Sequence, residues 1–458
     1  MVDDLGWNDV SWHDLQMQTP FLASLKDSNS AVLENAYVDQ LCTQTRTAFM
    51  TGYNPFKIGL QDGVFAPTET VGVPVEYTFF PEFLQNKGYS TYMLGKWHLG
   101  HCKKDYIPTT RGFDKFLGFY NGGQDYYSHM TEAQSKAGTI EGYDFWLQDE
   151  PAFNFKGQYS TEIFTEQAKI WLTEHDTAKP FFFYLSYQAV RYPLQVPDTY
   201  LSKCTQTYND RKLYCGMMYA LDQSVSSIVQ HLKDKQVYED TIIIFSTDNG
   251  ANTKHGGNNY PYRGNKGTIW EGGTKANSFV HSPKYITNPG TRTQLFHVVD
   301  WYATIMQIAG QTTTSYGDGI NQWSMITTGQ QTNNRELIVY NIADEGSAIR
   351  KGKYKYIVGN PGTPTGWVLP DGTTANADIN RKSMRHNGQL VDHFLFDLEK
   401  DPYETDNLYY DDEYANEAAD LDEDLTTLKG QMHTSIHGRG SRKCLPSSPD
   451  FIFPHDCC

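Results

Sequence analysis

Residues 241–250 read TIIIFSTDNG, a short apolar run that ends in an acidic residue and an amide. Such a run is typical of a buried strand. Just before it, apolar residues recur at helical spacing at Met218, Leu221, Val225, Ile228 and Leu232. A helix followed by a buried strand is the unit from which α/β sheets are built. In open α/β sheets ligands bind beyond the carboxyl ends of the strands, which is where Asp248 and Asn249 lie.

The same alternation extends along the first three quarters of the chain. Apolar runs at residues 92–94 and 181–185 predict further buried strands. Patterns at residues 79–87, 160–174 and 298–308 predict helices, two of which are followed by glycine, a common C-cap residue. Strands that alternate with helices favour an α/β fold, a sheet with helices on both faces.

After about residue 335 the pattern changes to short strands without intervening helices. Residues 337–340, 347–350, 353–357 and 394–398 predict an antiparallel sheet, and an acidic helix and a tail rich in Ser, Pro and Cys follow. We therefore predict two domains. The first is an α/β domain over residues 1–335, and the second is a smaller α+β domain over residues 336–458.

The composition excludes several classes of protein. With 458 residues, of which 39% are hydrophobic, the chain is long and apolar enough for one large core and a smaller one. A net charge of −16 argues against nucleic acid as the main partner, because phosphate binding needs clustered Lys and Arg. No apolar run approaches the roughly 18 residues that span a bilayer. Between Glu399 and Asp424, 12 acidic residues oppose only Lys400, which indicates a solvated helix and loop, with a partner site as the alternative.

Two acidic pairs occupy the ends of predicted strands. Asp3 and Asp4 follow what would be the end of a first strand, and Asp248 and Asn249 follow the strand quoted above. Three carboxylates and one amide form an all-oxygen ligand set, which suits Ca²⁺, or Mg²⁺, better than zinc. Each pair alone is also typical of a turn or a helix cap. When both pairs are considered together, a metal site and a pair of turns or helix caps are equally good interpretations.

Cationic residues are grouped in a similar way. Lys96 and His98 follow the predicted strand at 92–94, and Arg263 and Lys266 come after the second acidic pair. Fixed cations beside a metal would suit an oxyanion such as sulfate or phosphate, whereas solvated loop residues are the alternative. Cys42 and Arg46 start a predicted helix, whose N-terminus stabilises negative charge and so suits a nucleophile or a bound anion. A buried structural cysteine is the alternative there.

These residues belong to a longer series of ordered motifs, and with them the chain resembles the sulfatases of the alkaline-phosphatase superfamily, most closely the arylsulfatase B type. The motifs lie at residues 3–10, 95–100, 108–114, 125–129, 246–250, 263–273 and 395–408. The resemblance covers nearly the whole chain. It implies an alkaline-phosphatase-like mixed central sheet with helices on both faces, plus the small C-terminal α+β domain.

The resemblance also implies roles for individual residues. The calcium ligands would be Asp3, Asp4, Asp248 and Asn249. Cys42 stands where the family carries a cysteine that is oxidised to formylglycine, a further metal ligand whose hydrate attacks sulfur. Arg46 matches the residue that supports this nucleophile, and His98 matches the histidine that helps to break down the sulfated intermediate. Lys96 and Lys266 match the lysines that bind sulfate.

Two positions depart from the family pattern. The modification motif is Cys-x-Pro-x-Arg or Cys-x-Ala-x-Arg, usually with Ser before the Arg, but here Gln44 and Thr45 stand in the Pro and Ser positions. Conversion of Cys42 is therefore in question. Arg191 stands where the family has a histidine that contacts sulfate and helps to protonate the leaving group. Arginine holds an anion but does not give up a proton near neutral pH, so substrate binding should survive and turnover should suffer.

Two functions remain. The first is a calcium-dependent sulfuric-ester hydrolase acting on a sulfated sugar or aryl sulfate. The second is a sulfatase-like protein without turnover that binds sulfated glycans or has a structural role. In either case the expected partner is a sulfated small molecule or glycan. A phosphatase or phosphodiesterase is a distant third, because those sites generally use histidines for two zinc ions and here Asn249 follows Asp248.

The chain has seven cysteines, and an odd number leaves one for a separate purpose. With Cys42 assigned to the active site, six remain for three disulfides, as in a secreted or lysosomal-type protein. Cys204 and Cys215 are the preferred local pair, and the tail cysteines are expected to bond back to the main domain. Only Met1 and Val2 precede the first acidic pair, where the family has an apolar strand. We expect a few strand residues and a signal peptide to lie upstream.

Overall fold

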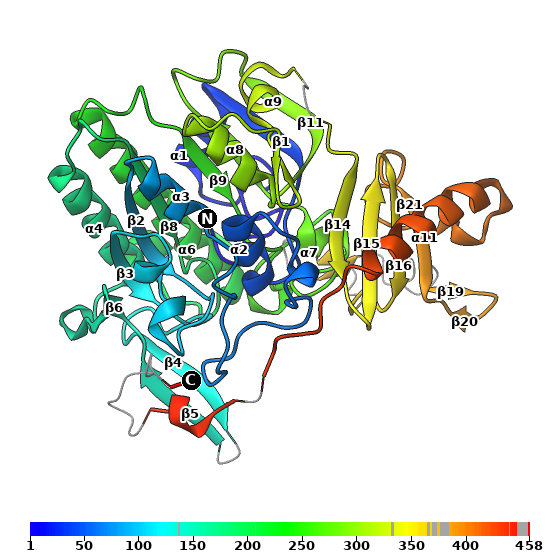
Figure 1. Ribbon diagram of the computed structural model, residues 1–458, viewed down its shortest axis with the longest axis horizontal. Coiled ribbons are helices and arrows are strands. Elements are labelled where there is room, and N and C mark those ends of the chain that lie inside the picture. The colour runs from blue at the N-terminus through cyan, green and yellow to red at the C-terminus, as the bar shows by residue number, and fades with distance from the viewer. Residues whose placement is uncertain are drawn as a thin grey trace.

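The predicted α/β sheet is present, and its strands end at the acidic pairs (Figure 1). The computed structural model describes residues 1–135, 138–206, 208–330, 334–363, 367–368, 373–375, 384–438, 440–446 and 457–458. One half of the sheet has the order β11-β1-β10-β9, and the other has the order β7-β6-β3-β2-β8. The strand bounds are β1 Ser30–Tyr37, β2 Ser90–Lys96, β3 Lys115–Phe119, β6 Trp146–Leu147, β7 Glu150–Pro151, β8 Phe181–Ser186, β9 Ile243–Ser246, β10 Ser278–His281 and β11 Gly290–His297.

The first residues of the chain join the two halves. The amino group of Met1 donates to the carbonyl of Leu185 in β8 at 2.8 Å. The amide of Val2 donates to the carbonyl of Ser246 in β9 at 2.9 Å, and Val2 forms a parallel bridge with Thr247. Parallel pairs such as β2–β8 and antiparallel pairs such as β9–β10 occur together. The mixed central sheet is therefore confirmed.

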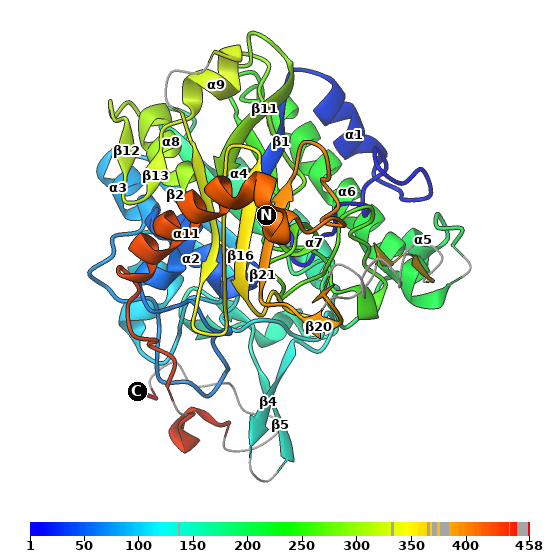
Figure 2. The same ribbon diagram turned by 90° about the vertical axis from the view of Figure 1, so that its right-hand side faces the viewer.

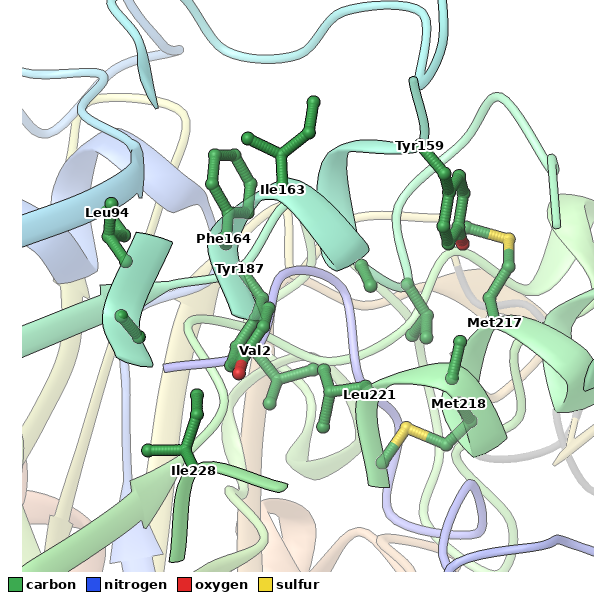
Figure 3. Packing of buried hydrophobic residues seen from close by; sticks show 14 of the residues in the cluster. Val2, Leu94, Tyr159, Ile163, Phe164, Tyr187, Met217, Met218, Leu221 and Ile228 are labelled. Atoms are coloured by element: carbon green, nitrogen blue, oxygen red, sulfur yellow. The ribbon is translucent and has the colours of Figure 1, made fainter. Parts of the chain in front are cut away.

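Helices cover both faces of this sheet because successive strand residues point to opposite sides. In β2, Leu94 packs into one hydrophobic cluster with α1, α4 and α6, as Figure 3 shows for part of that cluster. Its neighbour Met93 packs into a second cluster with α2, α3 and α8. The bounds of these helices are α1 Pro20–Asp27, α2 Cys42–Thr51, α3 Phe80–Asn86, α4 Ser160–Glu174, α6 Asn209–Asp234 and α8 Asp300–Ile308. The helices predicted at 79–87, 160–174 and 298–308 are confirmed within two residues.

Shorter elements complete this part of the chain. They are the hairpin of β4 Met130–Ser135 and β5 Gly138–Tyr143, the pair β12 Ser315–Tyr316 and β13 Gly319–Ile320, and the helices α5 Asp198–Leu201, α7 Glu271–Thr274 and α9 Trp323–Thr328. A cavity of about 990 Å³ lies beside β8 and β9 and is also lined by Met1. Among the described residues, no helix is both long and apolar enough to cross a membrane.

A separate antiparallel sheet forms near the C-terminus, as predicted (Figure 2). Its order is β14-β15-β16-β21, with bounds β14 Leu337–Ile342, β15 Gly346–Lys351, β16 Tyr354–Gly359 and β21 His393–Asp397. The acidic helix α11, Ala415–Lys429, packs on one face through Leu421 and Leu425. Two small ribbons pair β17 Trp367–Val368 with β18 Thr374–Ala375, and β19 Arg385–His386 with β20 Gln389–Leu390. The domain boundary at residue 335 stays a proposal, and residues 447–456 of the tail lie outside the described ranges.

Three disulfides account for six of the cysteines, namely Cys204–Cys215, Cys102–Cys458 and Cys444–Cys457. The preferred local pair is confirmed, and so is a bond from the tail to the main part of the chain. Cys42 is the free cysteine of the described chain, and it is buried.

The acidic stretch at 399–424 differs from the prediction at one residue. Glu404 is fully buried against the C-terminal sheet, where its carboxylate forms an ion pair with Nζ of Lys355 at 2.8 Å and accepts from the amide of Glu271 at 2.8 Å. Lys355 also contacts the Glu271 carboxylate at 3.1 Å. The solvated interpretation was wrong for Glu404, because the charge of a lysine distant in sequence compensates part of its burial. Burial and Glu271, opposed by Lys355, raise the pKa of Glu404 to about 7.

This shift predicts a pH dependence of stability. A carboxyl group whose pKa is higher in the folded state stabilises the fold at low pH, and Glu404 should lose this contribution as the pH rises from 4.5 to about 7. In Glu404→Gln, the decrease in unfolding free energy between about pH 5 and about pH 7.5 should therefore be smaller by about 1–3 kcal/mol. Urea unfolding at both pH values measures it. Glu413→Gln, at an exposed position, is the control, and an unchanged pH slope in Glu404→Gln would contradict the assignment.

Candidate active site

The two acidic pairs meet at the carboxyl ends of neighbouring strands. The amide of Asp4, whose φ is 59°, donates to Oδ1 of Asp248 at 3.1 Å. The amide group of Asn249 donates to Oδ1 of Asp4 at 2.8 Å. One ligand atom each from Asp3, Asp4, Cys42 and Asp248 lies within 4.8 Å of the others. All these side chains are buried. The sequence prediction that the pairs converge is therefore correct in geometry.

Each carboxylate has its own cation. Nζ of Lys96 lies 2.6 Å from Oδ2 of Asp3, and both side chains are fully buried. Nζ of Lys266 lies 2.5 Å from Oδ1 of Asp4. Arg46 donates twice to Oδ2 of Asp248, from Nη2 at 2.8 Å and from Nε at 3.2 Å. Three predicted cations therefore lie in the site and compensate the buried carboxylates.

The pKa values reflect this arrangement. Burial and the neighbouring Asp248 carboxylate raise the pKa of Asp3 to about 6. Burial also disfavours ionisation of Asp4 and Asp248, but Lys266 and Arg46 respectively hold their pKa values below the usual range. All three carboxylates are thus mainly ionised at neutral pH, and Asp3 is the one that protonates first as the pH falls.

The donor set fits a hard divalent cation. Oδ1 of Asn249 is buried and has no hydrogen-bond partner among the described residues, although burying an unpaired amide oxygen is unfavourable. A cation held by this oxygen and the three carboxylates would satisfy it. All these donors are oxygen atoms, which Ca²⁺ and Mg²⁺ prefer. The residues present therefore fit calcium, with magnesium as the less favoured ion.

Cys42 is the first residue of α2 and lies beside the carboxylates. Its Sγ accepts from Nζ of Lys266 at 3.2 Å and lies 3.6 Å from Oδ1 of Asp3, to which the thiol donates. Only 2% of the residue is exposed, and burial raises the pKa of its thiol despite the two nearby lysines. The unmodified residue is therefore a protonated thiol, which is a poor nucleophile.

The residues that depart from the family motif have structural partners. Nε2 of Gln44 donates to the carbonyl of Gln61 at 2.7 Å, so this side chain holds a loop instead of entering the site. Its Oε1 is buried without a partner in the described chain. Thr45 accepts from the amide of Asp39 at 2.9 Å and returns a bond to the Asp39 carbonyl at 3.2 Å. Both residues thus stabilise the start of α2.

The ring of His98 lies against Gly122. A Cβ added to Gly122 would lie 2.7 Å from Cε1 of His98, so no larger residue fits there. Nε2 of His98 lies 3.1 Å from the carbonyl of Phe65, and Nδ1 is buried without a partner in the described chain. Burial and Lys96 lower the pKa of His98 well below its usual value. A neutral ring that donates through Nε2 has a free Nδ1 that can accept a proton.

Arg191 occupies the neighbouring position. A Cβ added to Gly123 would lie 1.8 Å from its Nη1, so the guanidinium group lies directly over this glycine. Nη1 donates to the carbonyl of Tyr192 at 2.9 Å. Burial is outweighed by Asp3 and Asp4, which raise the pKa of Arg191. The residue is therefore a permanent cation that faces the acidic cluster.

One predicted cation lies elsewhere, and several partners were not predicted. Arg263 stacks on Trp270 at 3.9 Å and donates to the carbonyl of Glu404, so the expectation that it joins the anion site was wrong. Gly264, whose φ is 88°, lies between Arg263 and Lys266 in the sequence. Ser186 and Tyr184 contact Nη1 of Arg46 at 2.5 and 3.4 Å. Both residues could have been found from the sequence, because they lie near the carboxyl end of the predicted strand at 181–185, where site residues are expected.

Comparisons with known proteins agree with this geometry. Residues 1–311 match the family model described as Sulfatase. Arylsulfatase J of Mus musculus is 36% identical over 431 residues, which cover 88% of this chain and 71% of that relative. N-acetylgalactosamine-6-sulfatase of Homo sapiens is 28% identical over 72% of this chain and 65% of its own length. A solved structure, Ps i-CgsB in complex with k-i-k-neocarrahexaose, has a TM-score of 0.79 at 25% identity and covers 95% of this chain and 93% of its own.

Proposed function

Because this chain belongs to the sulfatase family, we propose that it is a calcium-dependent arylsulfatase that hydrolyses sulfate esters of sugars or aryl alcohols. The observation that carries the proposal is the convergence of Cys42, three carboxylates and three cations in one buried cluster. The finer likeness to the arylsulfatase B type is part of the proposal. Three disulfides favour an oxidising compartment, so we place the protein among secreted or lysosomal sulfatases.

In this proposal Asp3, Asp4, Asp248 and Asn249 hold calcium, together with the modified Cys42. Bound calcium supplies a Lewis acid beside the sulfate group, and formylglycine at Cys42 supplies a hydrated aldehyde as nucleophile. The cations of the site are already in place before the reaction. They can therefore stabilise the charge that develops on the transferring sulfuryl group without any rearrangement of the protein.

The other side chains bind the sulfate group and move protons. Lys96, Lys266 and Arg191 would hold the anion. His98, kept neutral by burial, would accept a proton at Nδ1. The leaving alcohol needs a proton, and Arg191 cannot give one near neutral pH. Turnover is therefore expected to be slow with poor leaving groups and faster with aryl sulfates, whose leaving groups need less protonation.

The nature of the relatives favours a sulfated sugar as the natural substrate. One relative is named N-acetylgalactosamine-6-sulfatase, and one structural neighbour is a complex with k-i-k-neocarrahexaose. We extend this substrate class to the present chain. A sulfate group carried by a sugar would meet Lys266 before Lys96, because 16% of the Lys266 side chain is exposed and the Lys96 side chain is fully buried.

Hydrolysis of a chromogenic aryl sulfate tests the proposal. We expect hydrolysis that stops when a calcium chelator is added and returns with Ca²⁺. Hydrolysis that persists after calcium removal would overturn the metal assignment. No hydrolysis by protein in which Cys42 is shown to be formylglycine would overturn the activity.

The second function, binding without turnover, is favoured by Arg191 and Gln44. Arg191 keeps the anion site strongly cationic, and Gln44 lies where the family motif has Pro or Ala. In that case the protein would bind sulfated glycans through Lys96, Lys266 and Arg191. Its signature would be saturable binding of a sulfated oligosaccharide, such as a carrageenan fragment, without release of sulfate.

Gln44→Pro is expected to raise the fraction of Cys42 that is converted to formylglycine when the protein is made with the modifying enzyme. Gln44 is the third residue of α2, in the first turn, where proline costs little because the amide has no helical partner. The variant loses the bond to the Gln61 carbonyl, so stability should fall by about 1 kcal/mol. Peptide mass spectrometry measures the conversion. Thr45→Ser is the matched motif change, and equal conversion in Gln44→Pro and wild type would contradict the prediction.

A further inference from the structure

We propose that residues 433–444, here named the strap, position His98 in the active site. The strap follows α11 and leads back to the α/β part of the chain, where Figure 1 shows it in red beside a blue segment. That segment is residues 56–69, here named the site loop. Residue 439 lies outside the described ranges. The kinetic part of the test rests on the proposed function.

Backbone hydrogen bonds join the strap to the site loop along its length. The amide of His433 donates to the carbonyl of Phe56 at 2.8 Å, and the amide of Ile436 donates to that of Gly59 at 2.8 Å. Farther along, the amide of Ser441 donates to the carbonyl of Thr68 at 2.7 Å. The strap therefore contacts the first part of the site loop, at Phe56 and Gly59, and its last part, at Thr68.

The contact is close enough to require glycine in the site loop. Gly59 has a φ of +83°, and a Cβ there would lie 2.4 Å from the carbonyl oxygen of Thr434. The same atom would lie 2.9 Å from Cγ2 of Ile436. Nε2 of Gln61 adds a bond to the carbonyl of His433 at 3.0 Å. These contacts leave no room for the site loop to move toward the strap.

His437 of the strap holds the turn that carries Phe65. Its Nδ1 lies 3.2 Å from Oε1 of Glu69, and its ring centroid lies 5.4 Å from that of Phe65. The other carboxylate oxygen of Glu69 accepts from the amide of Ala66 at 2.7 Å. His437 thus contacts both Phe65 and Glu69, at the two ends of this turn.

The site loop in turn orients His98. The carbonyl of Phe65 contacts Nε2 of His98 at 3.1 Å, and Nδ1 of that ring has no partner among the described residues. The amide of Phe65 donates to Oγ1 of Thr43, the residue after Cys42, at 3.3 Å. The orientation of the His98 ring therefore depends on where the strap holds Phe65.

The end of the chain is bonded to the segment that carries His98. Cys444 is bonded to Cys457, and Cys458 is bonded to Cys102, which lies four residues after His98. The amides of Cys457 and Cys458 also donate to the carbonyl of Cys102, at 2.7 and 3.0 Å. The segment that carries His98 is thus tied covalently to the same tail whose strap supports Phe65.

His437→Ala tests the proposal in the full-length protein. We expect the amides of residues 65–69 to exchange hydrogen about tenfold faster, because the turn loses its support. His98 should react about fivefold faster with diethyl pyrocarbonate, as read by peptide mass spectrometry. The kcat for an aryl sulfate should fall about tenfold while KM changes less than twofold, because the sulfate-binding lysines are untouched.

Two variants sharpen the test. Thr434→Ala removes an exposed side chain of the strap and should behave as wild type. His437→Asn keeps a donor at the position of Nδ1 and should restore most of the exchange protection and of kcat. Cys102→Ser with Cys458→Ser releases the other end of the tail and should likewise expose His98 to the reagent.

Lower thermal stability with unchanged exchange at residues 65–69 and unchanged reactivity of His98 would show a merely structural strap and overturn the proposal. If the wild-type protein does not hydrolyse the ester, the proposed function fails, but exchange and His98 modification still decide the role of the strap. A fall in kcat without faster exchange in the loop would also contradict it.

Discussion

Asp248→Asn is expected to abolish calcium-dependent hydrolysis and to destabilise the fold. The substitution removes one ligand charge and leaves Arg46, only 1% exposed at its side chain, without its carboxylate. Breaking a buried pair in this way costs about 3–5 kcal/mol, because a buried charge loses its partner. Loss of a metal ligand and a misplaced guanidinium group should lower the rate of sulfate-ester hydrolysis by about a thousandfold. Urea unfolding and initial rates at saturating Ca²⁺ measure the two effects.

A second buried pair provides the control for stability. Asp300→Asn disrupts the pairing with Arg335, which is 9% exposed at its side chain and lies outside the acidic cluster. This variant should lose stability comparably while its hydrolysis rate per folded molecule stays unchanged. If both variants lost activity in proportion to stability alone, Asp248 would have no special role in the site.

Arg191→His is expected to raise kcat by about a hundredfold for substrates with a poor leaving group. A histidine at this position can deliver a proton to the leaving alcohol, and general acid catalysis typically contributes at least this factor. KM should rise about tenfold, because a charge-assisted hydrogen bond to sulfate is weakened. The measurement is initial rate per formylglycine-containing site, so that incomplete modification of Cys42 does not distort the comparison.

Arg191→Lys is the matched comparison, because it keeps the charge and supplies no proton near neutral pH. The kcat should therefore rise only in Arg191→His. A gain that depends on the leaving group, large for alkyl and small for aryl sulfates, is the expected pattern. An Arg191→His variant no faster than wild type would show that protonation of the leaving group does not limit this enzyme.

The sequence predicted those helices and strands that are determined by residues close together in the chain. Helix α4 has the predicted bounds, and α2 begins at Cys42 as expected. The convergence of the acidic pairs was also predictable, since each ends a strand of one sheet. The positions of Lys96 and Lys266 in the sequence suggested an anion site, but only the resemblance assigned these two lysines to sulfate, because composition and spacing do not show which loop lysines turn inward.

Other features depend on contacts between residues distant in sequence. Glu404 is buried beside Lys355 of strand β16, and no sequence pattern near Glu404 signals this ion pair. Arg263 turns away from the site because Trp270 offers a ring face. The bond between Gln61 and His433 spans 372 residues, so the strap could not be found from local patterns. Side-chain direction at such positions is decided by packing rather than by propensity.

The most direct test of the central claim is peptide mass spectrometry across Cys42 in protein from its native source. The catalytic account predicts that the peptide carries formylglycine in place of the thiol, despite Gln44 in the motif. A peptide with only the unmodified cysteine would contradict it. In that case the buried, protonated thiol could not start the reaction, and the cationic pocket would serve to bind sulfated glycans instead.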